Sequence, residues 1–164
     1  MAPDLRTEPI SREEDKRACA RMMASTQPWI SLGFDEAFCL KRTADTQKEI
    51  LGAWSSGRLT GFLLLDMRGP FAGYIQTVCV EAERRGAGIG SALIRAAEER
   101  VHRDSPNVFL CVSTTNDRAR VLYERLGYAR VGELPDYLAR GRTEILMRKT
   151  AGTLLDFRAP GSAS

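Results

Sequence analysis

A glycine-rich turn is the part of this sequence whose residue types most directly suggest chemistry. It reads Arg85-Gly86-Ala87-Gly88-Ile89-Gly90 and lies between a strand-like and a helix-like segment. Glycines let a ligand approach the backbone, and a helix that begins here presents unpaired N–H groups and the positive end of its dipole. Arg84 and Arg85 add charge that persists at any physiological pH. The turn therefore predicts a phosphate or diphosphate site, although the same glycines could be plain turn formers.

The surroundings of the turn exclude two common nucleotide sites. A dinucleotide fold needs repeated βαβ units and an acidic residue about twenty positions after the glycines. Here the segments before the turn have the pattern of consecutive antiparallel strands instead. A nucleoside-triphosphate loop needs a lysine followed by serine or threonine, whereas this turn continues Gly90-Ser91-Ala92. Neither ligand fits the sequence.

The elements that must position the turn follow from hydrophobic periodicity. Apolar residues at helical spacing predict helices over residues 12–25, 35–43, 88–103 and 116–126. Ser11 to Glu14 has capping-box spacing, which predicts Ser11 as the cap of the first helix. Strands are predicted over residues 5–10, 50–54, 59–67, 74–80, 108–112, 128–131 and 143–148, with a loop over 134–141.

Two segments together resemble the GNAT (Gcn5-related N-acetyltransferase) family. The segment from Val78 to Leu93 resembles its acetyl-CoA motif, a strand followed by Arg/Gln-x-x-Gly-x-Gly/Ala, here Arg85, Gly88 and Gly90. The segment from Asn116 to Tyr128 resembles its second motif, Asn-x-x-Ala-x-x-x-Tyr followed by Gly-Phe or Gly-Tyr. Two motifs in this order are stronger evidence than either alone, and the resemblance extends over residues 47–149.

The resemblance implies an α+β, three-layer GNAT fold. Such a fold has a mixed, mostly antiparallel sheet of about six or seven strands flanked by about four helices. The length of 164 residues suits one domain, which we expect over residues 1–150, with residues 151–164 as a C-terminal tail. The implied activity is transfer of an acetyl group from acetyl-CoA to a primary amine of a small molecule or peptide, in a ternary complex.

The resemblance also implies roles for individual residues. Splayed strands at 77–80 and 108–112 would admit the pantetheine arm of coenzyme A, and residues 85–91 would hold its diphosphate. Tyr123 would act as the general acid for the departing thiolate, and the Val80 backbone N–H would hold the oxyanion. The cofactor-binding residues implied in this way are Val78, Cys79, Val80, Arg85, Gly86, Ala87, Gly88, Ile89, Gly90, Ser91, Asn116, Ala119 and Tyr123.

The base that deprotonates the amine is not evident in the sequence. Positions where related enzymes place a glutamate correspond here to Tyr74 and Cys111. Glu81 is the carboxylate nearest the turn, and it could equally be a solvated residue at the end of a strand. Glu133 and Asp136, in or near the loop expected on the acceptor side, are comparable alternatives, as is a chain of water molecules. The residues that could line the acceptor site are Trp29, Tyr74, Asp136 and Tyr137, and the aromatic ones could equally be packing.

Composition limits the other functions. A net charge of +3 suits an anionic ligand but is too small to predict a nucleic-acid partner. No apolar stretch reaches a membrane span, and four widely spaced cysteines favour reduced, packed thiols over a metal site, so we expect a cytoplasmic protein without a metal. A homodimer is left open. The competing function is a catalytically silent acyl-CoA-binding or interaction module, although retention of Asn116 and Tyr123 favours an enzyme.

Overall fold

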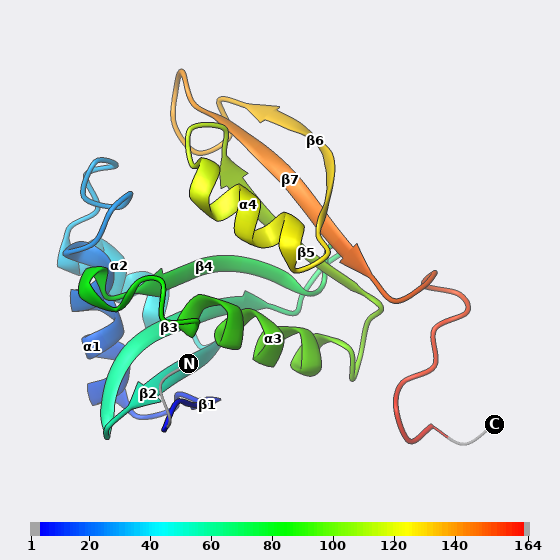
Figure 1. The fold of residues 1–164 in the computed structure, drawn as a ribbon, viewed down its shortest axis with the longest axis horizontal. Helices are drawn as coiled ribbons and strands as arrows, with labels where there is room; N and C mark the ends of the chain where they lie inside the picture. Colours follow the sequence, from blue (N-terminus) through cyan, green and yellow to red (C-terminus); the bar gives the residue numbers. More distant parts are fainter. Residues whose placement is uncertain (1–3, 163–164) are drawn as a thin grey trace. The chain divides into compact units, whose positions relative to one another are not determined.

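The computed structural model of the chain describes residues 4–162 (Figure 1). The predicted domain, residues 1–150, begins with residues 1–3 and the predicted tail, residues 151–164, ends with residues 163–164; these terminal residues lie outside the described part. The described residues form seven strands and four α-helices, with a short 3-10 helix after the fourth strand. In chain order they are β1 (Arg6–Pro9), α1 (Glu13–Ala24), α2 (Glu36–Thr43), β2 (Glu49–Ser55), β3 (Arg58–Asp66), β4 (Tyr74–Val80), the 3-10 helix (Ala82–Arg84), α3 (Ile89–Val101), β5 (Asn107–Ser113), α4 (Asp117–Arg125), β6 (Ala129–Pro135) and β7 (Thr143–Thr150).

All the strands of residues 4–162 belong to one seven-stranded sheet with the order β1-β2-β3-β4-β5-β7-β6. The pairs β1–β2, β2–β3, β5–β7 and β6–β7 are antiparallel, whereas β4 pairs with β5 in parallel through Tyr74 with Phe109 and Ile75 with Leu110. The sheet is therefore mixed and mostly antiparallel, and the predicted fold class is confirmed. The splay predicted between residues 77–80 and 108–112 stays a prediction.

The chain divides into two compact units, which are described separately. The N-terminal unit contains residues 4–66 and 77–97, and the C-terminal unit contains residues 67–76 and 98–162. Both β4 and α3 contribute residues to each unit. The glycine-rich turn belongs to the first unit, and Asn116 and Tyr123 belong to the second.

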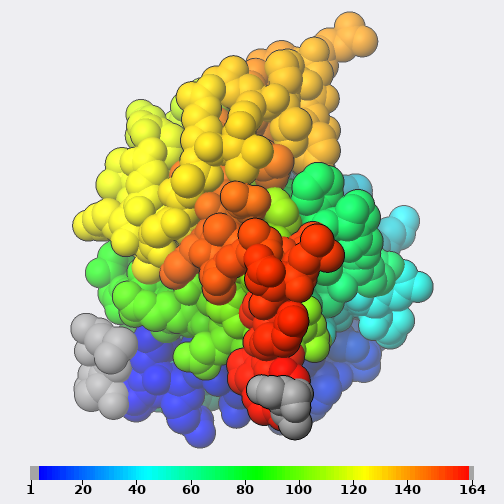
Figure 2. Space-filling view, turned by 90° about the vertical axis from the view of Figure 1, so that its right-hand side faces the viewer, coloured from blue at the N-terminus to red at the C-terminus, as the bar shows by residue number. Residues whose placement is uncertain are grey.

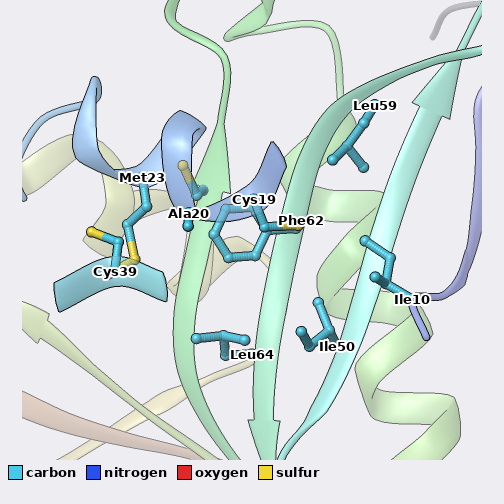
Figure 3. Close-up of a cluster of buried hydrophobic side chains, with 10 residues drawn as sticks. Ile10, Cys19, Ala20, Met23, Cys39, Ile50, Leu59, Phe62 and Leu64 are labelled. Carbon is cyan, nitrogen blue, oxygen red and sulfur yellow. The ribbon is translucent and has the colours of Figure 1, made fainter. Parts of the chain in front are cut away.

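The N-terminal unit is built on the β2–β3 hairpin, and α1 packs on both α2 and β3. β3 is buried over nearly its whole length because neighbouring strands flank both its edges. The core of the N-terminal unit contains the fully buried Phe62 together with three thiols, two of which, Cys19 and Cys39, are labelled in Figure 3. The members of this core are Ile10, Cys19, Ala20, Met23, Cys39, Ile50, Leu59, Phe62, Leu64 and Cys79. The four cysteines of the chain are free thiols.

Helix α1 begins differently from the prediction. Its cap is Arg12, in extended conformation and without a side-chain hydrogen bond to the helix, so the predicted Ser11 capping box is wrong. Three acidic residues in the first turn, Glu13, Glu14 and Asp15, lie where the helix dipole favours negative charge. Dipole stabilisation therefore takes the place of a side-chain cap. Helix α2 does have such a cap, because Asp35 Oδ1 accepts from Phe38 N at 2.7 Å.

The C-terminal unit is built on the antiparallel strands β5, β7 and β6. The β5–β7 register is continuous from Asn107 with Thr150 to Ser113 with Glu144. One face of this pair is apolar and buried, with Val108, Leu110 and Val112 on β5 and Ile145 and Met147 on β7. The other face is more open and carries Cys111, Ser113 and Leu146, all half-buried. Alternation along the strands thus gives one packed face and one face that is only partly covered at Cys111, Ser113 and Leu146.

Strand β6 is longer than predicted, extending from Ala129 to Pro135 instead of ending at Val131. A register irregularity between Arg130 and Gly132 absorbs one residue, after which pairing with β7 continues to Pro135 with Thr143. Leu134 and Pro135, predicted as loop, are therefore strand residues. Residues 151–162 contain no helix or strand, and most of them are exposed (red in Figure 2). No helix within residues 4–162 is long and apolar enough to cross a membrane.

Candidate active site

The glycine-rich turn presents its backbone to solvent. After the 3-10 helix Ala82–Arg84, Gly86 and Gly88 adopt φ angles of 83° and 82°, which favour glycine, and α3 begins at Ile89. No acceptor within residues 4–162 takes a hydrogen bond from the N–H groups of residues 86–91. The first hydrogen bond of the helix runs from Ala92 N to Gly88 O at 3.0 Å. The turn is thus a series of available donors at a helix N-terminus, as an anion requires.

Close packing in the N-terminal unit fixes the start of α3. Ile89 is buried, and a Cβ placed on Gly61 of β3 would lie 3.0 Å from Ile89 Cγ2 and from the Cys79 carbonyl oxygen. Gly61 therefore lets both α3 and the end of β4 approach β3 closely. The Glu81 N–H also donates to Thr60 O at 3.0 Å. These contacts hold the turn against the sheet.

Two of the charged residues around the turn, Arg85 and Glu81, have protein partners. Arg85 donates from Nη2 to the Gln27 carbonyl oxygen at 3.1 Å, which holds its guanidinium against the loop after α1. Glu81 forms a surface ion pair with Arg58 at the end of β4. Glu81 also lines a cavity of about 320 Å³ whose other walls include residues of α1. Its part in the reaction stays a prediction.

The strand before the turn alternates between a buried and a more open side. Ile75, Thr77 and Cys79 are buried, whereas Val78 and Val80 are half-buried. Desolvation by burial raises the pKa of the Cys79 thiol to about 12. Cys79 can therefore contact a cofactor through its backbone alone, and the predicted oxyanion donor is the backbone of Val80.

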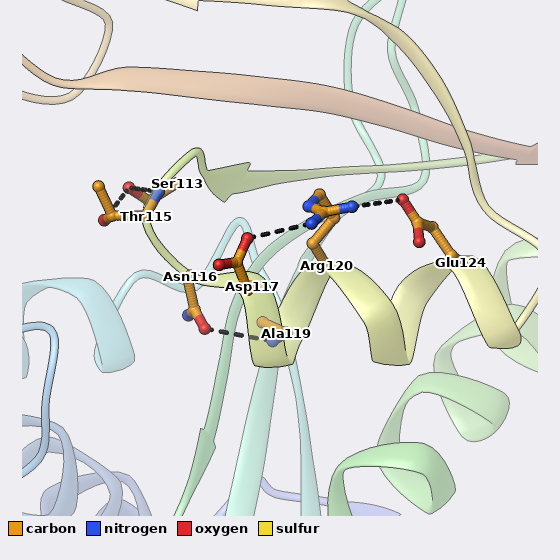
Figure 4. Close-up of polar contacts among 7 residues, drawn as sticks. All are labelled: Ser113, Thr115, Asn116, Asp117, Ala119, Arg120 and Glu124. Atoms are coloured by element: carbon orange, nitrogen blue, oxygen red, sulfur yellow. Dashed lines mark hydrogen bonds and ion pairs between the residues drawn. The ribbon is translucent and has the colours of Figure 1, made fainter.

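The first turn of α4 is ordered by side-chain hydrogen bonds (Figure 4). Asn116 is the cap rather than a helical residue, and its Oδ1 accepts from Ala119 N at 3.2 Å. The prediction that Asn116 lies within the helix is wrong, because its side chain satisfies a helix N–H and its backbone is not helical. Arg120 bridges Asp117 and Glu124, with both Nη···O distances at 3.0 Å. These bonds fix the start of the helix that carries Tyr123.

Tyr123 lies near the C-terminal end of α4, and its ring forms a T-shaped contact with Tyr128 at 6.1 Å between centroids. Desolvation by burial raises the pKa of Tyr123 to about 12. The phenol is therefore fully protonated at neutral pH. It can donate a proton to a thiolate, whose conjugate acid has an ordinary pKa of about 8.5. This is the property that the predicted general acid requires.

Tyr74 and Cys111, at the two positions where a glutamate was sought, come together in the C-terminal unit. The Tyr74 hydroxyl lies close enough to the Cys111 thiol and to the Tyr137 hydroxyl to interact with both. Burial raises the pKa of Tyr74 above its ordinary value, and interaction with Cys111 raises it further. Burial likewise raises the pKa of Cys111. Both groups are neutral at physiological pH and bind as hydrogen-bond partners.

Glu144 is a functional candidate that the sequence analysis missed. It lies on β7 directly opposite Ser113 and is only 7% exposed. Burial raises the pKa of its carboxyl, with opposition from the nearby Arg142. The available signal was a single acidic residue inside an apolar strand pattern, Thr143-Glu144-Ile145-Leu146-Met147. Glutamate side chains are rarely buried, so such a residue is expected to be exposed, whereas Glu144 is buried.

The other predicted acceptor-side residues have structural partners. Glu133 forms an ion pair with Arg130 on the same strand. Asp136 adopts a φ of 54° and accepts from Gly141 N, which closes the loop between β6 and β7. Trp29 packs against the core of the N-terminal unit. Tyr137 is 57% exposed and is close enough to Tyr74 to interact with it. Of these four, Tyr137 is the one that lies near the Tyr74 and Cys111 pair.

Comparison with known proteins identifies the family. The sequence model of the Acetyltransferase (GNAT) family matches residues 13–128. The chain belongs to this family. N-alpha-acetyltransferase RimI of Mycobacterium tuberculosis is 29% identical over 158 residues, covering 89% of this chain and 96% of that protein. An uncharacterised N-acetyltransferase of Methanocaldococcus jannaschii is 34% identical over 113 residues, covering 61% of this chain and 72% of that protein.

Solved structures agree with this GNAT assignment at the level of the fold. Ard1 from Thermoplasma volcanium superposes with a TM-score of 0.75 at 21% identity, covering 93% of this chain and 100% of that chain. An aminoglycoside 6'-N-acetyltransferase complexed with coenzyme A superposes with a TM-score of 0.72 at 19% identity, covering 90% and 98%. The chain is an acyl-CoA-dependent acetyltransferase of the GNAT family.

The glycine-rich turn fits the cofactor of the family, acetyl-CoA. A diphosphate needs several donors and free space around the backbone. Residues 86–91 supply N–H groups without other partners, and nothing lies within 4 Å of the position that a Cβ on Gly88 would occupy. Arg84 is exposed beside the turn and can add charge. No group of three or more potential metal ligands occurs among residues 4–162.

Proposed function

We propose that this GNAT acetyltransferase transfers an acetyl group from acetyl-CoA to a primary amine of a small molecule or peptide, by direct attack within a ternary complex. The observation that carries the proposal is Tyr123, a protonated phenol held on an ordered helix in the second family motif. A sequence relative of this chain is an N-alpha-acetyltransferase and a structural neighbour is an aminoglycoside 6'-N-acetyltransferase, and the acceptors of both are amines. An amine acceptor is therefore the class that the resemblance favours.

Each group has a defined part in this reaction. Bound acetyl-CoA supplies the activated acetyl group as a thioester. Backbone N–H groups of residues 86–91, with Arg85, would hold the diphosphate, and the backbone of Val78, Cys79 and Val80 would align the pantetheine arm. The Val80 N–H would hold the developing oxyanion. Tyr123 would give its proton to the sulfur as the C–S bond breaks.

The experiment is release of free coenzyme A from acetyl-CoA across a panel of amines, with the wild type and Tyr123→Phe. The panel contains peptide α-amines, lysine side chains, polyamines and aminoglycosides. We expect turnover with at least one class and a fall in kcat of about 100-fold or more in Tyr123→Phe. The affinity for coenzyme A, measured by calorimetry, should change little, because the phenol acts on the departing sulfur.

The competing function is a silent acyl-CoA-binding module. It would bind coenzyme A tightly and release no free thiol with any amine of the panel, and that result would refute the proposed enzyme. A Tyr123→Phe variant as active as the wild type would instead refute the role of the phenol. The four free thiols are typical of a reducing compartment, so we infer that the reaction takes place in the cytoplasm.

A further inference from the structure

We infer that Glu144 is the base that takes the proton of the acceptor amine, and that Tyr74 and Cys111 are the neutral polar groups that order the acceptor beside it. This inference rests on the proposed function, because it assigns the deprotonation step of that same reaction. The sequence offered Glu81, Glu133 and Asp136 as alternatives for the base, whereas Tyr74 and Cys111 occupy the positions where related enzymes place a glutamate. The structure supplies a carboxylate from a strand that the sequence analysis did not connect to them.

Strand register places Glu144 on the same face of the sheet as Cys111. Ser113 and Glu144 are directly opposite on the antiparallel strands β5 and β7, and directly opposite residues share a face. Cys111 is two residues before Ser113 and therefore lies on that face as well. This is the more open face of the C-terminal unit, where Cys111, Ser113 and Leu146 are half-buried. An acceptor reaching Cys111 would thus lie one residue pair away from Glu144.

The Tyr74 hydroxyl extends this cluster across a third strand. Tyr74 is opposite Phe109 in the parallel register of β4 and β5, two residues from Cys111. Its hydroxyl lies close enough to Cys111 and Tyr137 to interact with them, and Cys111 in turn is close enough to Glu144 for their charges to interact. Three strands and one loop therefore contribute to one polar cluster.

Glu144 differs from the other carboxylates of its unit. Glu98 is similarly buried, at 8% exposed, but its Oε2 accepts from Lys149 Nζ at 2.8 Å. Asp104, Asp117, Glu124 and Glu133 are bound to arginines. Glu144 has no ion pair within residues 4–162, although Arg142 lies near enough to interact with its charge. Burying a carboxylate that has no ion-pair partner is unfavourable for folding, so a cationic ligand would relieve part of that cost.

The groups around Glu144 leave it the member of the cluster that can accept a proton at neutral pH. Arg142 lies two residues before it, ahead of β7, and Ser113 is directly opposite on β5, with Cys111 two residues before Ser113. The residue opposite on β6 is the apolar Leu134. Tyr74 and Cys111 keep their protons at neutral pH, because burial raises their pKa values. Burial raises the pKa of Glu144 toward neutrality, which makes its carboxylate a better proton acceptor.

The proton balance of the proposed step is complete. Glu144 takes one proton from the ammonium form of the acceptor and later releases it to solvent. The neutral amine forms the C–N bond as the C–S bond breaks, with the electron pair of that bond going to sulfur. Tyr123 gives its proton to the sulfur and recovers one from the new amide nitrogen. The nitrogen loses two protons in all. One passes through Glu144 to solvent, and the other replaces on Tyr123 the proton that Tyr123 gave to coenzyme A.

The test compares Glu144→Gln with the matched control Glu99→Gln, an exposed glutamate on α3, in steady-state kinetics with the best amine from the panel. We expect kcat/KM for the amine to fall about 100-fold at neutral pH in Glu144→Gln and to change less than about twofold in the control. The loss should shrink as the pH rises toward the pKa of the amine, because the free base then forms without help. Coenzyme A affinity should be unchanged in both variants.

Several outcomes decide the inference. A loss in Glu144→Gln that is the same at every pH would overturn it, since a purely structural role has no such dependence. Normal activity of Glu144→Gln would also overturn it while leaving the proposed function intact. If that variant does not fold, Glu144→Asp keeps the charge and replaces it in the test. The measurement is then the fall of kcat/KM on the acidic side of the pH profile. A shift of that fall from its wild-type position would support the inference, whereas an unshifted profile would refute it. No turnover by the wild type with any amine would refute the proposed function itself, and the inference with it.

Discussion

The two compact units use different parts of the polypeptide for chemistry. The N-terminal unit offers backbone N–H groups at the start of α3, whereas the C-terminal unit offers side chains, Tyr123 on α4 and a polar cluster of Tyr74, Cys111 and Glu144. A backbone site needs glycines and a helix start, and these are contiguous in sequence. A side-chain site needs strands from distant parts of the chain. The difference explains why the cofactor is easier to infer than the acceptor.

The largest expected effect concerns the core that supports the backbone site. Phe62 is fully buried in the N-terminal unit, so Phe62→Ala should lower the free energy of unfolding by about 3–5 kcal/mol through lost burial and a cavity. Urea denaturation followed by circular dichroism measures this change. The control is Phe71→Ala in the C-terminal unit, whose ring is 55% exposed and should contribute less than about 1.5 kcal/mol. Equal losses in the two variants would contradict the assignment of the core.

The next effect tests the backbone site directly. Arg85→Glu places negative charge beside the glycine-rich turn and should weaken coenzyme A binding by about 10-fold to 100-fold. Arg95→Glu, an exposed position further along α3, makes the same charge change and should have a small effect. Calorimetric titration with coenzyme A measures both. Because Arg85 also bonds to Gln27, the unfolding temperature of each variant is measured as a control for loss of stability. Unchanged affinity of Arg85→Glu for coenzyme A would refute the placement of the diphosphate.

A third effect concerns the pH dependence of stability that comes from buried thiols in the N-terminal unit. Burial raises the pKa of Cys19 and of Cys79 in the N-terminal unit to about 12 from an ordinary value of 9.0. The stability linked to these protonated thiols is fully present below about pH 9 and is lost as the pH rises toward 12, by roughly 1.4 kcal/mol per pH unit for each thiol. Denaturation between about pH 8 and pH 10 measures this contribution together with that of Cys39 and Cys111, whose pKa values burial raises as well.

The matched variant for this measurement is Cys79→Ala. It should be less stable at neutral pH, and its stability should fall less steeply between about pH 9 and pH 10 than that of the wild type. Identical slopes would mean that the Cys79 thiol already titrates near its ordinary pKa, and therefore that it is accessible to water in the folded protein.

The smallest effect concerns the helix that carries Tyr123. Asn116→Ala removes the cap bond to Ala119 N and should lower the free energy of unfolding by about 1 kcal/mol. Asn116→Asp retains the accepting oxygen and should restore most of that stability. Thermal unfolding measures both variants. Should Asn116 bind the cofactor as well, the alanine variant would also raise the KM for acetyl-CoA, and an unchanged KM would limit Asn116 to capping.

Several elements could be predicted because their signals are local. β4 was predicted over residues 74–80 and is found there, since alternation of Ile75, Thr77 and Cys79 with half-buried residues marks a strand directly. Helices α3 and α4 agree with prediction to within two residues because their apolar faces repeat at helical spacing. The start of α1 was predicted incorrectly because a capping pattern competes with alternatives that only the folded backbone selects.

The sequence by itself determined the donor side of this protein. Arg85 to Gly90 and Asn116 to Tyr123 are contiguous motifs, and their chemistry follows from residue type and from the helix that begins or continues there. Tertiary structure alone decided the meeting of Tyr74, Cys111 and Glu144. They come from strands β4, β5 and β7, and their proximity depends on a parallel pairing and on an antiparallel register. A shift of one residue in that register would turn Glu144 to the other face, and no local pattern in the chain specifies it.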